Sequence, residues 1–159
     1  MRMNLSTTHA RKCALAGGLI LAWLSPGIAG AALGEAEASV QADGVQLLAS
    51  SIKVTEHAAY RQHEIQLPSG TRVREFAGAD GKVFAIAWNG PTIPNLRQTM
   101  GRYFDSYVAA AKGKHTGHSR LRIQQADLVV ESTGHMRAFA GRAYLPQAVP
   151  GGVDLGELR

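Results

Sequence analysis

The sequence predicts an α+β domain in which a mostly antiparallel sheet carries one long helix packed on one face. Three observations lead to this class. The first half of the chain contains strand-sized segments separated by turns of hairpin length, an amphipathic helical segment follows, and the last third returns to strand-sized segments. The order of several strands, one long helix and several further strands is typical of an α+β fold.

Two turn sequences divide the first run of strands. LPSGT at 67–71 and ADGK at 79–82 place proline and glycine where tight turns favour them. They separate strands predicted at 60–67, 71–77 and 82–88, which form an antiparallel meander, and residues 52–56 are a candidate for a further strand. The segment VFAIAW is apolar at every position, so both its faces should be covered and its strand should lie centrally. The Ala- and Glu-rich stretch at 33–45 should enter the fold loosely or as a helix.

The long helix is predicted after the sequence GPTIP, where two prolines end the preceding strand and Asn95 can cap the next element. The helix should end at Lys112, whose positive charge interacts favourably with the C-terminal end of the helix dipole, and Gly113 just beyond it should terminate the helix. Strands are then expected at 121–126, 128–131 and 136–145, with Thr133-Gly134 as the turn between the last two. The apolar residues of the helix recur at helical spacing and should cover one face of the sheet; they are Leu96, Met100, Tyr103, Phe104, Tyr107 and Ala111.

The first 31 residues have the features of a cleavable signal peptide. Four basic side chains without an acid precede CALAGGLILAWL, an uncharged run much shorter than the roughly 20 residues of a membrane span. A signal peptidase needs a pair of small residues before the cleavage site. This pair can be Ala29 and Ala31, for cleavage after residue 31, or Gly30 and Ala32, for cleavage after residue 32. We expect export through the general secretory route to the periplasm or the medium, one domain at 32–159, and no transmembrane segment after cleavage.

Charge and cysteine content exclude several classes. The leader takes Arg2, Arg11, Lys12 and the single cysteine with it, which leaves 14 basic against 12 acidic side chains. Such a small excess does not indicate binding to nucleic acid through bulk charge. A mature chain without cysteine has neither a disulfide nor thiolate chemistry, so its stability must come from a packed core.

Four motifs in order carry a family resemblance: HEIQLPSGTRVREF from His63, FAIAWNGPTIPNLRQ from Phe84, GRYFDSY from Gly101 and GHMRAFAGRAYLP from Gly134. Together they resemble a family of small exported bacterial proteins, the domain-of-unknown-function family 2844. The similarity spans most of the mature chain, roughly residues 33–145. It implies export and a single domain, and it implies no activity, because the family has no established chemistry to transfer.

Candidates for catalysis are few. His63, Glu64 and His135 are the acid-base residues we single out, although neighbours such as His63 and Glu64 point to opposite faces of a strand. The mature chain has no Gly-x-Ser-x-Gly elbow and no phosphate-cradling glycine loop. HTGH at 115–118 could chelate, but it supplies two ligands where zinc usually takes three or four from the protein. We therefore predict no metal and no cofactor.

Candidates for binding are a basic segment and a tryptophan. The segment KGKHTGHSRLR at 112–122 contains no acid, and it reads either as a solvated loop or as a patch for anionic envelope components such as phosphate-bearing polymers or lipid headgroups. Trp88, at the end of an apolar strand, is either a core residue or, with Tyr103 or Tyr144, part of a ligand groove. The binding candidates in the segment are Lys112, Lys114, His115, His118, Arg120 and Arg122.

Two functions from different classes follow. The first is an exported binding or accessory protein of the bacterial envelope, with an anionic envelope component or another exported protein as its partner and without enzymatic activity. The alternative is a small hydrolase-like or metal-dependent enzyme that uses His63, Glu64 or His135.

Overall fold

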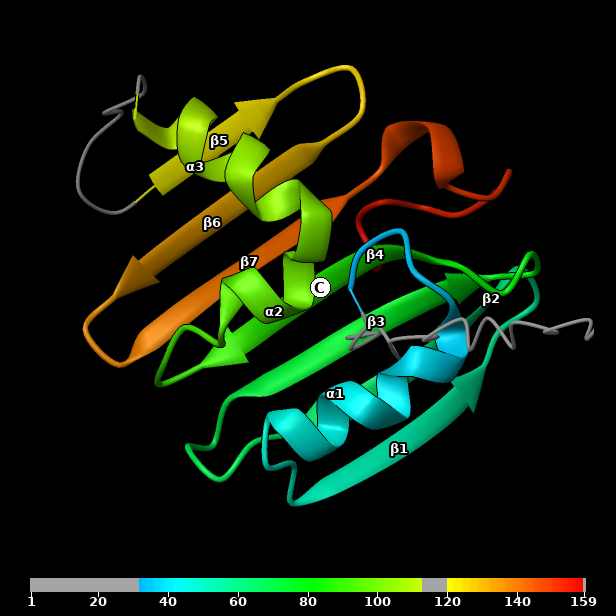
Figure 1. Cartoon of the computed structure of the whole chain (residues 1–159), viewed down its shortest axis with the longest axis horizontal. Helices are drawn as coiled ribbons and strands as arrows, with labels where there is room; N and C mark the ends of the chain where they lie inside the picture. The colour runs from blue at the N-terminus through cyan, green and yellow to red at the C-terminus, as the bar shows by residue number, and fades with distance from the viewer. Residues whose placement is uncertain (1–31, 113–119, 159) are drawn as a thin grey trace, which may run out of the picture.

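The computed structural model describes residues 32–112 and 120–158, which form one seven-stranded antiparallel sheet with helices on one side (Figure 1). The strand order is β1-β2-β3-β4-β7-β6-β5, so β4 lies at the centre. The predicted signal peptide and most of the basic segment lie outside the described residues. The strands are β1 Ser51–Glu56, β2 Tyr60–Gln66, β3 Arg72–Gly78, β4 Val83–Gly90, β5 Arg120–Gln124, β6 Val129–His135 and β7 Ala138–Tyr144.

This architecture confirms the predicted α+β class and the first meander. β1 to β4 pair with their neighbours in chain order, β5 to β7 form a second meander, and β4 joins the halves by pairing with β7. The predicted turn at Thr133-Gly134 is wrong. Both residues lie in β6, and the turn occupies Met136 and Arg137, because His135 pairs with Ala138 and Arg137 takes the left-handed φ of 63° that closes the hairpin.

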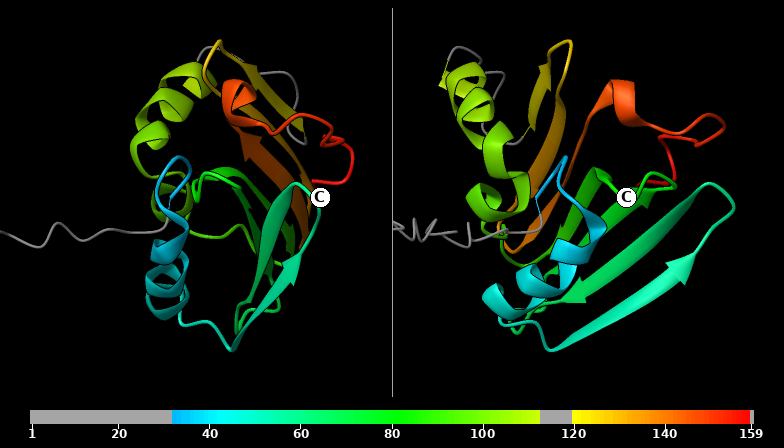
Figure 2. Two further views of the ribbon diagram at one scale, coloured as in Figure 1. Left: turned by 90° about the vertical axis from the view of Figure 1, so that its right-hand side faces the viewer. Right: turned by 45° about the vertical axis from the view of Figure 1, so that its right-hand side comes forward.

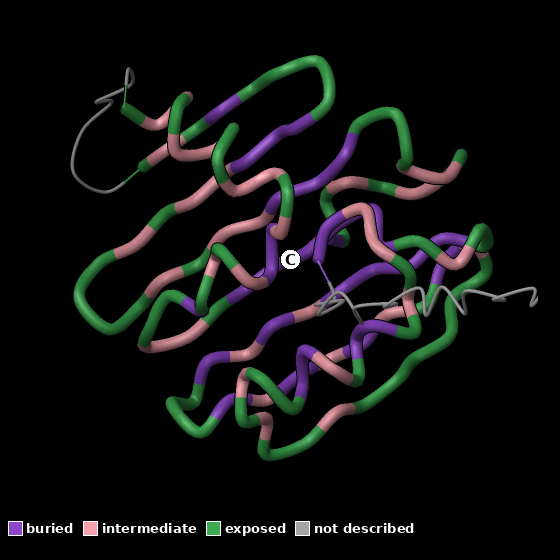
Figure 3. The backbone as a smooth tube through the Cα atoms, viewed as in Figure 1, coloured by how far each residue is buried: buried purple, intermediate pink, exposed green. Residues whose placement is uncertain are grey.

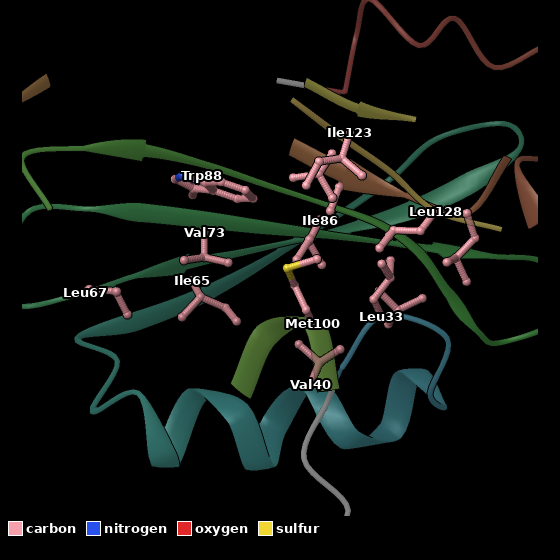
Figure 4. Close-up of a cluster of buried hydrophobic side chains, with 14 residues drawn as sticks. Leu33, Val40, Ile65, Leu67, Val73, Ile86, Trp88, Met100, Ile123 and Leu128 are labelled. Atoms are coloured by element: carbon pink, nitrogen blue, oxygen red, sulfur yellow. The ribbon is translucent and has the colours of Figure 1, made fainter. Parts of the chain in front are cut away.

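Helices cover one face of the sheet, which we call the helix face; the opposite side is the open face. Figure 2 shows α1 Val40–Gln46, α2 Leu96–Met100 and α3 Phe104–Lys112 together on the helix face, whereas the C-terminal residues lie toward the open face. Val40 of α1 and Met100 of α2 point toward Ile86 of β4 (Figure 4), and all three are fully buried. Short 3-10 turns occupy Glu37–Ser39, Gly101–Tyr103 and Pro146–Ala148.

The predicted single long helix is divided at Gly101. The Asn95 cap is present, since its side chain accepts a hydrogen bond from the backbone N–H of Gln98. Gly101, however, has a left-handed φ of 50°, and a Cβ there would lie 2.3 Å from the Cβ of Ala32. The chain therefore turns between α2 and α3 where the N-terminal segment packs, a contact that helical periodicity cannot report.

Strand β4 is covered on both faces, as its apolar sequence predicts. Val83, Ile86 and Trp88 belong to the core cluster on the helix face. Phe84, Ala85 and Ala87 belong to a second cluster, which is on the open face. A register shift opposite Phe76 and Ala77 of β3 lets Phe84 and Ala85 contribute to the same cluster. Figure 3 shows this buried centre against the exposed edge strand β1.

The C-terminal tail provides the cover on the open face. After the 3-10 turn Pro146–Ala148, the chain runs to Leu158, which is fully buried in the second cluster. Arg142 anchors the tail by donating from Nη1 to the carbonyl oxygen of Leu155. The tail therefore covers the apolar end of the open face and reaches its polar part at Arg142.

Candidate binding groove on the open face

Seven residues form a row across the open face, one from each strand, and we call it the charged row. Each member is the register partner of the next, so all seven side chains lie on the same side of the sheet. Charges alternate outward from an uncharged centre at Ala87. The row from edge to edge is Lys53, Glu64, Arg74, Ala87, Arg142, Glu131 and Arg122.

Each glutamate of the charged row is shared by two arginines. Nε of Arg74 lies 3.2 Å from Oε2 of Glu64, and Nε of Arg72 lies 3.4 Å from Oε1 of the same carboxylate. On the other side of Ala87, the carboxylate of Glu131 accepts from Nε of Arg142 at 2.8 Å. The same glutamate lies 3.5 Å from Nε of Arg122. Because two cations face one anion on each side, both clusters keep a net positive charge.

A groove of about 510 Å³ lies beside this row. Arg74 forms one side, and Glu131, Thr133 and Arg142 form the other. Its remaining lining includes the short side chains of Asn89 and Ala140, the buried Leu158 of the tail, and Trp88 and Gly141. This set, the open-face groove, combines an apolar boundary with a few polar groups, which is the usual composition of a ligand site.

A second hollow of about 330 Å³ lies between the β1–β2 and β3–β4 turns. Five of its nine lining residues are alanine or glycine, from the two turns and the end of β3. His57, which also lines it, stacks on Tyr60 with ring centroids 4.4 Å apart. Of its ionisable lining residues, Arg61 is paired with Glu37 on the helix side, and none belongs to the two glutamate-arginine clusters of the open face. The open-face groove is therefore the stronger candidate site.

The helix face contains a buried polar cluster of a different kind. His63 is 6% exposed, and its Nε2 lies 2.7 Å from Oε1 of Glu37, which also pairs with Arg61. Its register partner Glu75 is fully buried, and neither carboxyl oxygen has a hydrogen-bond partner among the described residues. Burial, with a smaller contribution from Asp43, raises the pKa of Glu75 well above its usual range. Glu75 lines neither the open-face groove nor the second hollow.

The three predicted acid-base residues are not brought together. His63 faces the helices, Glu64 is on the open face between Arg72 and Arg74, and His135 is exposed at the end of β6 instead of beginning the last strand. Within residues 32–112 and 120–158, no three His, Cys, Asp or Glu side chains are arranged to hold a metal ion. These residues therefore do not form a shared catalytic constellation.

The predicted binding residues are placed in part. Lys112 ends α3, and Arg120 and Arg122 lie on the open face of β5. Lys114, His115 and His118 lie outside the described residues. Trp88 lines the groove, but its side chain is 3% exposed and packs in the helix-face core, so the indole offers no aromatic surface to a ligand.

Sequence reasoning missed Arg74 and Arg142. The alternation in RVREF and GRAY could have placed each arginine on a sheet face. That both flank the same residue of β4 depends on the pairing of β4 with β7, which no local pattern contains.

The comparison with protein families matches residues 29–158 to the family described as Protein of unknown function (DUF2844). The chain belongs to this family. The matched residues include all seven strands of the sheet. No curated protein and no solved structure matched the chain. Among the described helices of this DUF2844 protein, none is long and apolar enough to cross a bilayer.

Proposed function

We propose that this DUF2844 protein is an exported binding or accessory protein of the bacterial envelope, and that it takes an anionic partner on the open face of its sheet. The leader-like sequence of the first 31 residues supports export. The observation that carries the binding proposal is the charge of the open face. Strand side chains on that face include two acids, Glu64 and Glu131, and six bases: Lys53, Arg72, Arg74, Arg120, Arg122 and Arg142.

Charge asymmetry between the faces explains how a nearly neutral domain can attract an anion. The strand side chains of the open face carry a net of four positive charges, and the tail over this face adds the acids Asp154 and Glu157, so a basic excess remains where the sheet is not covered by helices. A surface with one dominant sign raises the local concentration of oppositely charged partners and speeds their encounter. Arg120 and Arg122 of the basic segment lie in β5, so their permanent charges belong to this surface.

Binding fits the geometry better than catalysis does. A catalytic site needs an acid, a base or a nucleophile within reach of one reacting atom. The groove holds Glu131 already engaged by two arginines, whereas His63 lies on the opposite face of the sheet. The enzyme alternative would need His63, with Glu37 beside it, to act away from Glu64, or His135 to act at the end of β6.

Cosedimentation of the exported protein with envelope fragments tests the proposal. The protein should sediment with fragments at low salt and be released at high salt, because exposed charges are screened over about 8 Å at physiological ionic strength. A variant with Lys112, Lys114, Arg120 and Arg122 changed to Ser should bind more weakly and melt at nearly the same temperature as the parent. Retention in the cytoplasm, or sedimentation that salt and the variant leave unchanged, would overturn the proposal. Hydrolysis of ester, phosphate or glycoside substrates that His63→Ala abolishes would favour the enzyme.

A further inference from the structure

We propose, on the basis of the binding function above, that Arg74 and Arg142 together bind one oxyanion group of the ligand, a carboxylate or a phosphate. Glu64 and Glu131 are the positioning residues of this oxyanion site. The inference deepens the proposed function by naming the chemical group that the groove recognises.

The two arginines lie symmetrically about the central strand. Ala87 is the register partner of Arg74 on β3 and of Arg142 on β7. Neighbouring strands are about 4.8 Å apart, so the two arginine backbones are separated by roughly 10 Å. The side chain between them is only a methyl group, which is 1% exposed and therefore covered. The space available to a ligand is the open-face groove, which both arginines line. A small anion there is within reach of a guanidinium from each side.

Both guanidinium groups are held before a ligand arrives. Glu64 and Glu131 lie on the outer sides of Arg74 and Arg142, so each carboxylate orients its arginine without filling the space between them. Each arginine side chain is 18% exposed, which makes it less hydrated than a freely exposed arginine. Since less ordering is needed on binding, such pre-organised donors favour affinity.

Hydrogen-bond donors remain for the ligand. Nε of Arg74 is engaged by Glu64, but neither terminal nitrogen makes a hydrogen bond to a described residue. Arg142 already donates to Glu131 and to the carbonyl of Leu155, so Arg74 offers the greater free capacity. The side chains of Asn89 and Thr133 line the same groove and likewise make no hydrogen bond within the described part of the chain. A planar guanidinium fork matches a carboxylate or phosphate through two parallel hydrogen bonds.

Titration of the exported protein with inorganic phosphate and, separately, with acetate tests the site, with backbone amide chemical shifts as the readout. The shifts should change first at Ala87, Asn89 and Ala140. Arg74→Gln should weaken binding about tenfold, as loss of a charge-assisted pair predicts. Arg97→Gln is the matched control, because Arg97 lies on α2, away from the groove, and its side chain is 69% exposed. The phosphate affinity of this variant should stay within about twofold of that of the parent protein.

Glu64→Gln separates anion binding from a structural role. Glutamine keeps an oxygen that can accept from Nε of Arg74, so the positioning is retained, but the negative charge beside Arg72 and Arg74 is lost. Phosphate affinity should therefore rise several-fold, about the effect of one nearby charge. If the arginine-glutamate cluster only supports the fold, Arg74→Gln and Glu64→Gln should both lower the phosphate affinity of the protein. That result would overturn the inference. If neither anion shifts these amides while salt-sensitive envelope binding persists, the oxyanion site is wrong and the proposed function stands. A response to one anion alone identifies which group the site accepts.

Discussion

Gly141 lies directly against the indole of Trp88, because the two residues are register partners on β7 and β4. A Cβ at Gly141 would fall 2.3 Å from Cζ2 of Trp88 and 2.8 Å from the carbonyl oxygen of Glu131. The absence of a side chain at this position therefore permits the indole to lie flat on the sheet within the helix-face core.

Gly141→Ala is expected to destabilise the domain by about 2 kcal/mol, because the added methyl group overpacks a site closed by a large ring and by backbone. Chemical denaturation monitored by tryptophan fluorescence measures the change. Gly151→Ala is the control, since a Cβ there meets no atom within 4 Å. Equal midpoints for the two variants would show that Trp88 does not pack as described.

Leu48→Gly is expected to stabilise the domain by about 1 kcal/mol. Leu48 follows the C-cap of α1 with a left-handed φ of 53°, and its side chain is 76% exposed. The N–H of Ala49 donates to the carbonyl of Gly44, and that of Leu48 donates to the carbonyl of Val45, as in a Schellman motif that usually has glycine at this position. Glycine removes the steric cost of the left-handed conformation while little buried surface is lost.

Thermal melting of the parent and of Leu48→Gly measures this gain. Leu48→Ala is the matched control, because it removes the same exposed side chain and keeps the Cβ. A gain in Leu48→Ala as large as that in Leu48→Gly would attribute the effect to the exposed leucine and not to its backbone conformation.

Glu75→Gln is expected to stabilise the domain at neutral pH and to have little effect below about pH 4. Because burial raises the pKa of Glu75 in the folded state, its carboxyl stays protonated there while the unfolded chain ionises as the pH rises above about 4.5. The parent should therefore lose stability at about 1.4 kcal/mol per pH unit from there up to the raised pKa. The glutamine variant lacks this loss.

Denaturation of both proteins between pH 4 and 8 measures the difference. Asp43, which contributes to the raised pKa of Glu75, and His63, its register partner, stay unchanged in both proteins, so the comparison isolates the Glu75 carboxyl. Glu56→Gln, which removes an exposed carboxyl from the edge strand β1, is the control. A stability difference that does not grow with pH would contradict a buried, protonated Glu75.

The exported protein is expected to begin at Ala32 or Leu33. Leu33 is fully buried and its N–H donates to the carbonyl oxygen of Thr99, and cleavage at either position keeps Leu33 in the domain. Mass spectrometry of the protein from the periplasm and the medium measures the terminus. A mature form that still begins at Met1, or one that lacks Leu33, would contradict the predicted processing.

Local sequence patterns determined much of this fold. The turns LPSGT and ADGK, the alternation between them and the wholly apolar VFAIAW predicted a meander with β4 at the centre, and Asn95 predicted the start of α2. These features are readable because backbone preference and side-chain periodicity act over a few residues. The Thr133-Gly134 turn failed for the same reason, since cross-strand pairing extended β6 through both residues.

Contacts between distant residues decided the rest. The break at Gly101 depends on Ala32, the cover of the open face depends on Leu158, and the pairing of Arg74 with Arg142 around Ala87 depends on the β4–β7 ladder. A sequence period reports which face of a strand a side chain occupies, but not which strand lies beside it. The sequence alone thus determined the strands, their faces and the expectation of export, whereas only tertiary packing placed the arginines of the candidate site together, because strand order and register depend on non-local burial.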